Sequence, residues 1–168
     1  SVWARAGIYT GTGSEVVLLR SDIALYGGFA GGERRLDERD LAAGHNSVID
    51  GENARRCVTG ANNAVLDGFT LTNGASAYGA GIFCYNTAPE IRNCFLINNT
   101  ASSSGGGIRC ENTLTQSPRI VNCVIANNRA PVEGGGISVW VDSLVDISFC
   151  TIANNTGVGV FNHNGLCK

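Results

Sequence analysis

Methionine is absent from the 168-residue chain, proline occurs only three times, and charged residues make up only 15% of the sequence. The low charge density and the net charge of −2 argue against the basic surface with which proteins bind nucleic acids. No run of about 18 apolar residues is present, so no membrane span is predicted. The missing methionine and the absence of a leader-like start suggest a segment of a longer, processed protein.

Familiar catalytic and metal-binding motifs are missing as well. The chain contains no GxSxG, HExxH, phosphate-binding loop or calcium nonapeptide. Its seven cysteines form no CxxC pair and no Cys/His cluster, which argues against a zinc site. A polysaccharide hydrolase would need two carboxylates about 5–10 Å apart, and a calcium-dependent lyase several carboxylates beside a base. We expect no cofactor and no metal, and the enzyme question stays open, leaning towards no activity.

Glycine, in contrast, is abundant, and the chain repeats itself. The 23 glycines indicate many turns between short strands. Residues 91–110, IRNCFLINNTASSSGGGIRC, and residues 120–139, IVNCVIANNRAPVEGGGISV, are identical at ten of twenty positions. Related copies begin at Leu66 and Ile147, so the first residues of the four copies lie 25, 29 and 27 positions apart. Such a period indicates conserved strands joined by loops of variable length.

Each repeat holds three short strand-like pieces, and none is long enough for an amphipathic helix. Around the repeat that begins at Ile91 they are residues 90–92, 94–97 and 107–110, which we name strands A, B and C. In strand B, Cys94 and Leu96 alternate with different residues, which is the period of two of a strand with one buried face. Stacking such repeats would pair each strand in parallel with its copy in the next coil, forming sheets A, B and C.

We therefore predict an all-β fold, a parallel β-helix (solenoid) of about six three-stranded coils that forms a single domain over residues 1–168. One charged excursion at residues 30–46 leaves the coil, could form a short helix around Leu36–Ala42, and could cover an end or sheet B. Earlier strands are expected at Val16–Leu19, Ile23–Tyr26, Val48–Asp50, Cys57–Thr59 and Val65–Asp67.

Asparagine and glycine mark the corners of the predicted coils. Asparagine pairs end strand B at residues 98–99, 127–128 and 154–155. Asparagine tolerates the left-handed backbone of a sharp corner, and stacked copies can pass amide hydrogen bonds from coil to coil. The glycine triplets at 105–107 and 134–136 are expected to let the loop approach its neighbour without a Cβ clash.

The cysteines fall into two repeat positions that both face inward. Cys94, Cys123 and Cys150 share one position, and Cys84 and Cys110 share the other. They can serve as small core residues. Stacked Cα atoms about 4.8 Å apart also lie within the range of a disulfide, so oxidised pairs remain an alternative.

At this point the sequence resembles a known family. GGGI at 105–108 and 134–137, with FLIN at 95–98, resembles the GGx[ILV]/FxxN repeats of polymorphic outer-membrane proteins. More widely it resembles the right-handed parallel β-helix repeats of bacterial cell-surface proteins in the pectin-lyase-like superfamily. The opening segments WARAGIY (3–9), ALYGGFAGGE (24–33) and VIDG (48–51) fit the same pattern. The resemblance implies a right-handed coil in a secreted or cell-surface protein, but that superfamily includes lyases, hydrolases, adhesins and stalks.

The outward residues of sheets A and B suggest structural roles. Sheet A carries charges of alternating sign, which favours cross-strand pairing. Sheet B is flat and mostly uncharged, and can be an ordinary surface or be packed by a loop or neighbour. The charged outward column of sheet A contains Glu90, Arg119 and Asp146, with Asp67 and Arg92 beside it. The uncharged outward column of sheet B, which we call the flat column, contains Thr70, Phe95, Val124 and Thr151.

Sheet C carries the candidate binding residues. Aromatic rings beside an arginine and carboxylates suit a sugar, because rings pack on its apolar faces and charges bind its hydroxyls or uronates. By resemblance, strand C is also where β-helical polysaccharide lyases place their cleft. The predicted substrate-binding residues are Phe83, Tyr85, Arg109, Glu111, Trp140 and Asp142.

The leading functional prediction is a non-enzymatic, secreted or cell-surface β-helix of adhesin type that binds a polysaccharide or surface glycan. The first alternative is a polysaccharide lyase or glycoside hydrolase acting on acidic polysaccharide. The second is a structural stalk or filament unit that associates end to end or with the rest of a longer chain. No nucleic-acid partner and no membrane span are expected.

Overall fold

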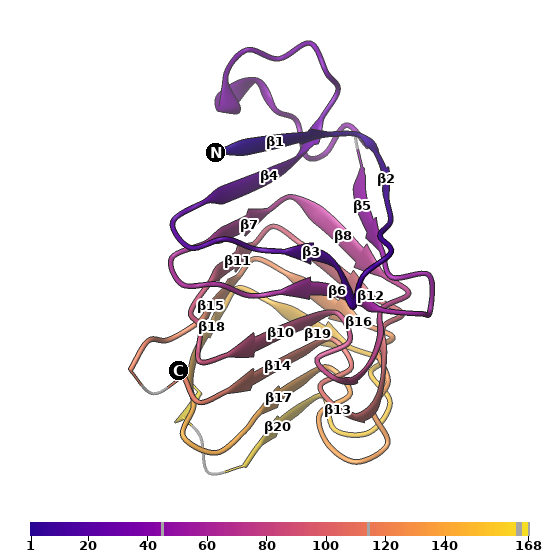
Figure 1. The fold of residues 1–168 in the computed structure, drawn as a ribbon, viewed down its shortest axis with the longest axis vertical. Coiled ribbons are helices and arrows are strands. Elements are labelled where there is room, and N and C mark those ends of the chain that lie inside the picture. The colour runs from indigo at the N-terminus through magenta and orange to yellow at the C-terminus, as the bar shows by residue number, and fades with distance from the viewer. Residues whose placement is uncertain (45, 114, 164–165, 168) are drawn as a thin grey trace.

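The computed structural model describes residues 1–44, 46–113, 115–163 and 166–167, and these form a parallel β-solenoid of about six coils (Figure 1). Sheet A contains seven strands: β1 (Val2–Arg5), β4 (Ala24–Phe29), β7 (Val65–Asp67), β11 (Glu90–Arg92), β15 (Arg119–Val121), β18 (Leu144–Ser148) and β21 (Leu166–Cys167). Sheet B contains six: β2 (Gly7–Tyr9), β5 (Ser47–Asp50), β8 (Phe69–Thr72), β12 (Phe95–Ile97), β16 (Val124–Ala126) and β19 (Thr151–Ala153).

Sheet C also contains six strands, and Figure 1 shows them one below another on the near side of the stack. They are β3 (Glu15–Leu18), β6 (Arg56–Thr59), β10 (Ile82–Tyr85), β14 (Ile108–Glu111), β17 (Ile137–Val139) and β20 (Val160–Asn162). A separate two-stranded sheet, β9 (Ala75–Tyr78) and β13 (Thr100–Ser104), lies in the loops between sheets B and C. The predicted fold class and the assignment of strands A, B and C are confirmed.

The core consists of columns of like side chains, because every coil repeats the same inward positions. In sheet A, Leu66 pairs with Ile91 and Ile91 with Ile120, and all three are fully buried. Leucine and isoleucine stack in the same way in sheets B and C, for example Leu96 on Ile125 and Ile108 on Ile137. Burying these columns supplies the main stabilisation, at about 25 cal/mol per Å² of apolar surface removed from water.

The two asparagines of each pair have different roles. The first, such as Asn98 with φ 58° and Asn127 with φ 56°, adopts the left-handed conformation at the corner. The second joins the coils and is buried at Asn99 and Asn128: Asn99 donates through Nδ2 to Asn128 Oδ1 at 3.0 Å, and Asn128 donates to Asn155 Oδ1 at 3.1 Å. The predicted amide ladder is therefore present, on the second residue of each pair.

The corner between sheets A and B has its own column of left-handed residues. Gly68, Asn93 and Asn122 occupy it in successive coils with φ of 80°, 52° and 51°. Asn122 donates to Asn93 Oδ1 at 2.7 Å, and Asn93 donates to Asp67 Oδ1 at 2.9 Å. In the next coil the position holds Phe149, which has φ 56° and is 88% exposed. The ladder stops at this bulky residue.

We predict that Phe149→Asn stabilises the protein. A left-handed conformation costs an ordinary L-residue about 1–2 kcal/mol, asparagine tolerates it better, and the new amide could extend the ladder from Asn122. The free energy of unfolding is expected to rise by about 1 kcal/mol, measured by urea denaturation. Phe95→Asn is the matched control, because Phe95 is 51% exposed but lies in an extended strand. The explanation would be contradicted if the free energy of unfolding rose for Phe95→Asn, or if it did not rise for Phe149→Asn.

The excursion at residues 30–46 extends past the N-terminal coil in Figure 1, and residue 45 lies outside the described part. The predicted helix at Leu36–Ala42 is wrong in extent, because only one 3₁₀ turn, η1 (Leu36–Glu38), forms. After it the chain becomes extended so that Arg39 can reach Asp67 at 3.1 Å. Backbone N–H groups of Ala30 and Gly31 bind the Glu33 carboxylate and lower its pKa to about 2.

Asp67 ties this excursion to the coil. Its carboxylate is 2% exposed and accepts hydrogen bonds from Arg39, from Arg92 at 2.8 Å and from Asn93 at 2.9 Å. The predicted charge pairing on sheet A is confirmed, since Arg119 also lies 3.5 Å from Glu90 and 3.9 Å from Asp146. The flat column of sheet B is in the predicted register.

Six cysteines are free thiols: Cys57, Cys84, Cys94, Cys110, Cys123 and Cys150. Each sulfur of the first column donates to a carbonyl of its own coil, as Cys94 does to Arg92 at 3.1 Å and Cys123 to Val121 at 3.3 Å. Burial raises the pKa of Cys57 to about 12, and contact with the Cys84 thiol together with burial raises the pKa of Cys110. The structure thus uses cysteine as a small core residue. No helix among the described residues has the length and hydrophobicity to span a membrane.

Candidate functional site

A groove of about 350 Å³ lies where the loops between sheets B and C meet the outer surface of sheet C. We call it the C groove. It combines aromatic rings, hydroxyls and charges, and its lining residues are Tyr78, Ser103, Ser104, Arg109, Glu111, Val132, Glu133 and Trp140.

One wall of the C groove comes from a repeat position just before strand C. Tyr78, Ser104 and Glu133 lie side by side in successive coils, through the pairs Ser104–Tyr78 and Ser104–Glu133. Each precedes a left-handed glycine, as with Gly105 (φ 68°) and Gly134 (φ 56°). Glycine is needed there because the chain turns sharply into strand C, and the turn places the preceding side chain at the groove.

Arg109 forms the floor of the C groove and is 4% exposed. Its guanidinium carbon lies 4.7 Å from the centre of the Tyr78 ring and 4.6 Å from that of Trp140. Its Nε and Nη2 atoms both lie 3.0 Å from Glu111 Oε2, and Nη1 donates to Ser104 Oγ. The cation therefore has aromatic, carboxylate and hydroxyl partners, which offset the cost of burying it.

The two rings of the C groove differ in what they offer a ligand. Trp140 packs against Arg109 of the preceding coil and stacks on His163 of the following coil, with centroids 4.4 Å apart and planes at 17°. Its faces are thus engaged within the protein. Tyr78 packs against Arg109 but remains 45% exposed. Tyr78 is therefore the ring on which a ligand can stack.

The carboxylates supply the polar groups that face solvent. Glu111 uses Oε2 for Arg109. The carboxylate of Glu133 has neither a hydrogen bond nor an ion pair among the residues that the structure describes. The groove thus presents acceptor oxygens beside an exposed ring. Across the described residues, no cluster of three or more His, Cys, Asp or Glu side chains could hold a metal ion.

Three of the six predicted binding residues, Arg109, Glu111 and Trp140, meet in the C groove. Phe83 and Tyr85 lie one coil earlier, in register with Arg109 and Glu111, with their rings 6.0 Å apart. The Phe83 ring is packed by the Arg56 guanidinium at 4.8 Å, and Tyr85 is 52% exposed. Asp142 is exposed in the turn after β17 and does not line the groove.

Sequence reasoning missed five lining residues, all in the loops that it left unassigned: Tyr78, Ser103, Ser104, Val132 and Glu133. A signal for three of them was available. When the repeats are aligned on the glycines that precede strand C, Tyr78, Ser104 and Glu133 share the column just before the first glycine. Serine, tyrosine and glutamate have little in common, so the column does not stand out by composition.

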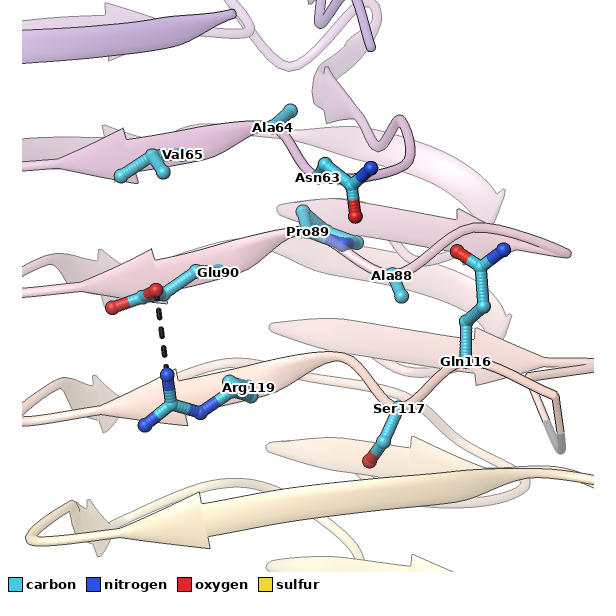
Figure 2. Close-up of a pocket in the computed structure, with 9 residues that line it drawn as sticks. All are labelled: Asn63, Ala64, Val65, Ala88, Pro89, Glu90, Gln116, Ser117 and Arg119. Atoms are coloured by element: carbon cyan, nitrogen blue, oxygen red, sulfur yellow. Dashed lines mark hydrogen bonds and ion pairs between the residues drawn. The ribbon is translucent and has the colours of Figure 1, made fainter. Parts of the chain in front are cut away.

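A second cavity of about 350 Å³ lies at the corner between sheets C and A (Figure 2). It is lined by Asn63, Ala64, Val65, Ala88, Pro89, Glu90, Gln116, Ser117 and Arg119. Its carboxylate, Glu90, already pairs with Arg119 at 3.5 Å and with Arg92 at 3.1 Å. No aromatic ring is among these residues, so this cavity offers a ligand less than the C groove.

Comparison with protein families matches residues 22–166 to a family described as "Protein of unknown function (DUF1565)". No curated protein and no solved structure matches the chain.

Proposed function

Because the chain belongs to the DUF1565 family, whose description assigns no activity, we propose its function from the C groove: the protein binds a carbohydrate there without transforming it. The observation that carries the proposal is the Tyr78 ring, held on Arg109 and 45% exposed beside two carboxylates. Sugars bind where a rigid ring covers their apolar face and fixed polar groups bind their hydroxyls.

The parallel stack also suits a chain-like ligand. Equivalent positions recur in every coil, about 4.8 Å apart along the axis, so a glycan could contact successive coils. Exposed Tyr85, one coil before Glu111, would then extend the binding surface beyond the groove. Phe83 and Asp142 belong to the same proposed surface.

The biological setting is part of the proposal. The GGGI and FLIN repeats resemble those of polymorphic outer-membrane proteins and of pectin-lyase-like bacterial surface proteins. On that resemblance we propose a right-handed coil and an adhesin-like role, secreted or at the cell surface, with a polysaccharide or surface glycan as partner. A stalk that self-associates end to end would have no need of an exposed ring above a buried arginine.

Tyr78→Ala is expected to weaken glycan binding about tenfold, because it removes the exposed ring and leaves the polar groups in place. Glycan-array screening would identify a ligand, and isothermal titration calorimetry would measure the change. Phe95→Ala removes a similarly exposed ring from sheet B and should leave the affinity unchanged. Equal losses in both variants, or binding that survives Tyr78→Ala, would place the ligand elsewhere. Tyr85→Ala tests whether the surface extends by one coil.

Glu111 and Glu133 favour a second candidate function, because they line one groove and a glycoside hydrolase requires two carboxylates. A hydrolase would release new reducing ends, and Glu133→Gln would abolish their release. A polysaccharide lyase would instead produce the absorbance of unsaturated uronates. Binding with neither product supports the non-enzymatic proposal.

A further inference from the structure

We infer that the C groove selects glycans that carry protonated amino groups and discriminates against uronic-acid polymers. This inference rests on the proposed function and names its ligand class. It departs from the expectation that Arg109 would bind an acidic sugar, and three observations lead to it.

The first observation is that Arg109 is covered by its own partners and offers little to a ligand carboxylate. Its Nε and Nη2 atoms bind Glu111, its Nη1 binds Ser104, and Tyr78 and Trp140 pack against the guanidinium. A uronate would need two parallel guanidinium N–H groups. Glu111 occupies the pair formed by Nε and Nη2, and the N–H groups that remain on Nη1 and Nη2 belong to a residue that is only 4% exposed. Displacing Glu111 would leave that carboxylate without its partner, which is costly for a partly buried charge.

The second observation is the balance of charge. One guanidinium and two carboxylates line the C groove, so these groups leave an excess of one negative charge. In the coil above, the cation Arg56 is engaged with the Phe83 ring and with the backbone oxygens of Gly79 and Tyr78. A uronate approaching the groove would therefore meet charge of its own sign.

The third observation is that acceptor oxygens remain free. The Glu133 carboxylate has no partner within the described part of the chain, and Glu111 binds Arg109 through Oε2. An ammonium group has three donors and no acceptor, so it complements such oxygens. When one sugar stacks on Tyr78, a glycan that follows the column can present an ammonium to Glu133, which lies next to Ser104 and two coils after Tyr78.

The test compares three oligosaccharides of equal length by isothermal titration calorimetry at low salt, below the pKa of the amino groups. They are oligomers of glucosamine, of N-acetylglucosamine and of galacturonic acid. We expect the glucosamine oligomer to bind at least about tenfold more tightly than the N-acetylated one, and the galacturonate oligomer to bind most weakly. Added salt should weaken only the glucosamine complex appreciably, because screening acts on its ion pair.

Glu133→Gln should lower the affinity for the glucosamine oligomer to about that of the parent protein for the N-acetylated oligomer. The substitution breaks no contact described in the fold, so the variant should fold as the parent does. Glu90→Gln, in the cavity of Figure 2, is the matched control and should leave the affinity for the glucosamine oligomer unchanged.

The outcomes separate the two proposals. Galacturonate binding as tight as glucosamine binding, or equal affinity for the amino and N-acetylated oligomers, would overturn the inference while carbohydrate binding stands. The inference also fails if Glu133→Gln leaves glucosamine binding unchanged. If none of the three oligomers binds, and a glycan array gives no ligand either, the proposed function fails and the inference fails with it.

Discussion

Asn128→Ala is expected to lower the free energy of unfolding by about 3–5 kcal/mol, one of the largest effects of any single substitution in this chain. Asn128 is fully buried and uses both ends of its amide. Its Oδ1 accepts from the N–H of Asn99 at 2.9 Å and from Asn99 Nδ2 at 3.0 Å. Its Nδ2 donates to Leu96 O at 2.8 Å and to Asn155 Oδ1 at 3.1 Å. Alanine removes all four bonds and leaves a cavity.

The size of the effect follows from the partners that remain. A buried polar group that loses its partner costs about 1–3 kcal/mol. Asn99 Nδ2 keeps a bond to Leu71 O and Asn155 Oδ1 keeps one to the N–H of Asn128, so these two lose less. The N–H of Asn99 and the carbonyl of Leu96 lose the amide partner that they have here.

The neighbouring asparagine supplies the control for this prediction. Asn127 is exposed and has φ 56°, a conformation that glycine adopts freely, so Asn127→Gly should change the stability by less than about 0.5 kcal/mol. Urea denaturation followed by circular dichroism measures both variants. Equal losses of unfolding free energy for Asn128→Ala and Asn127→Gly would mean that the buried amide ladder contributes no more to stability than the asparagine at the corner. A loss below about 1 kcal/mol for Asn128→Ala would contradict the argument directly.

The fold could be predicted from the sequence because one physical requirement recurs in every coil. Leu66, Ile91 and Ile120 must fill the same place in the core, so the chain carries the same kind of residue at each return. The asparagine pairs were equally informative, since a left-handed corner and a buried amide ladder both select asparagine. The single turn η1 was not predictable in its extent, because pairing of Arg39 with Asp67 outweighs local helix propensity.

The candidate site was predictable only on its strand side. Alternation along strand C placed Arg109, Glu111 and Trp140 on the outer surface, where the structure has them. Alternation could not show that Arg109 is 4% exposed, because Tyr78 and Ser104, which help to cover it, come from loops of variable length. That Glu133 has no partner among the described residues is likewise invisible in the sequence, since it depends on which cations the loops bring near.

Gly135→Ala is the second substitution for which we expect a severe loss, about 3 kcal/mol or more, or no recovery of folded protein. Gly135 is the central residue of a triplet in which the loop from sheet B passes beside the following coil. A Cβ atom at this position would overlap the carbonyl oxygen of Thr156 and would lie 3.2 Å from the carbonyl oxygen of Asn128. Both are backbone atoms, so no side-chain rotation relieves the clash.

Relief of the clash would also displace Glu133 in the C groove, because Gly135 follows Glu133 by two residues and the left-handed Gly134 lies between them. Gly32→Ala is the matched control: a Cβ there meets no atom within 4 Å, so its stability should change by less than about 1 kcal/mol. Thermal unfolding by circular dichroism compares the two variants with the parent. If Gly135→Ala melts within a few degrees of the parent, the coils do not approach each other closely enough to require glycine, and the stacking described for this loop is wrong.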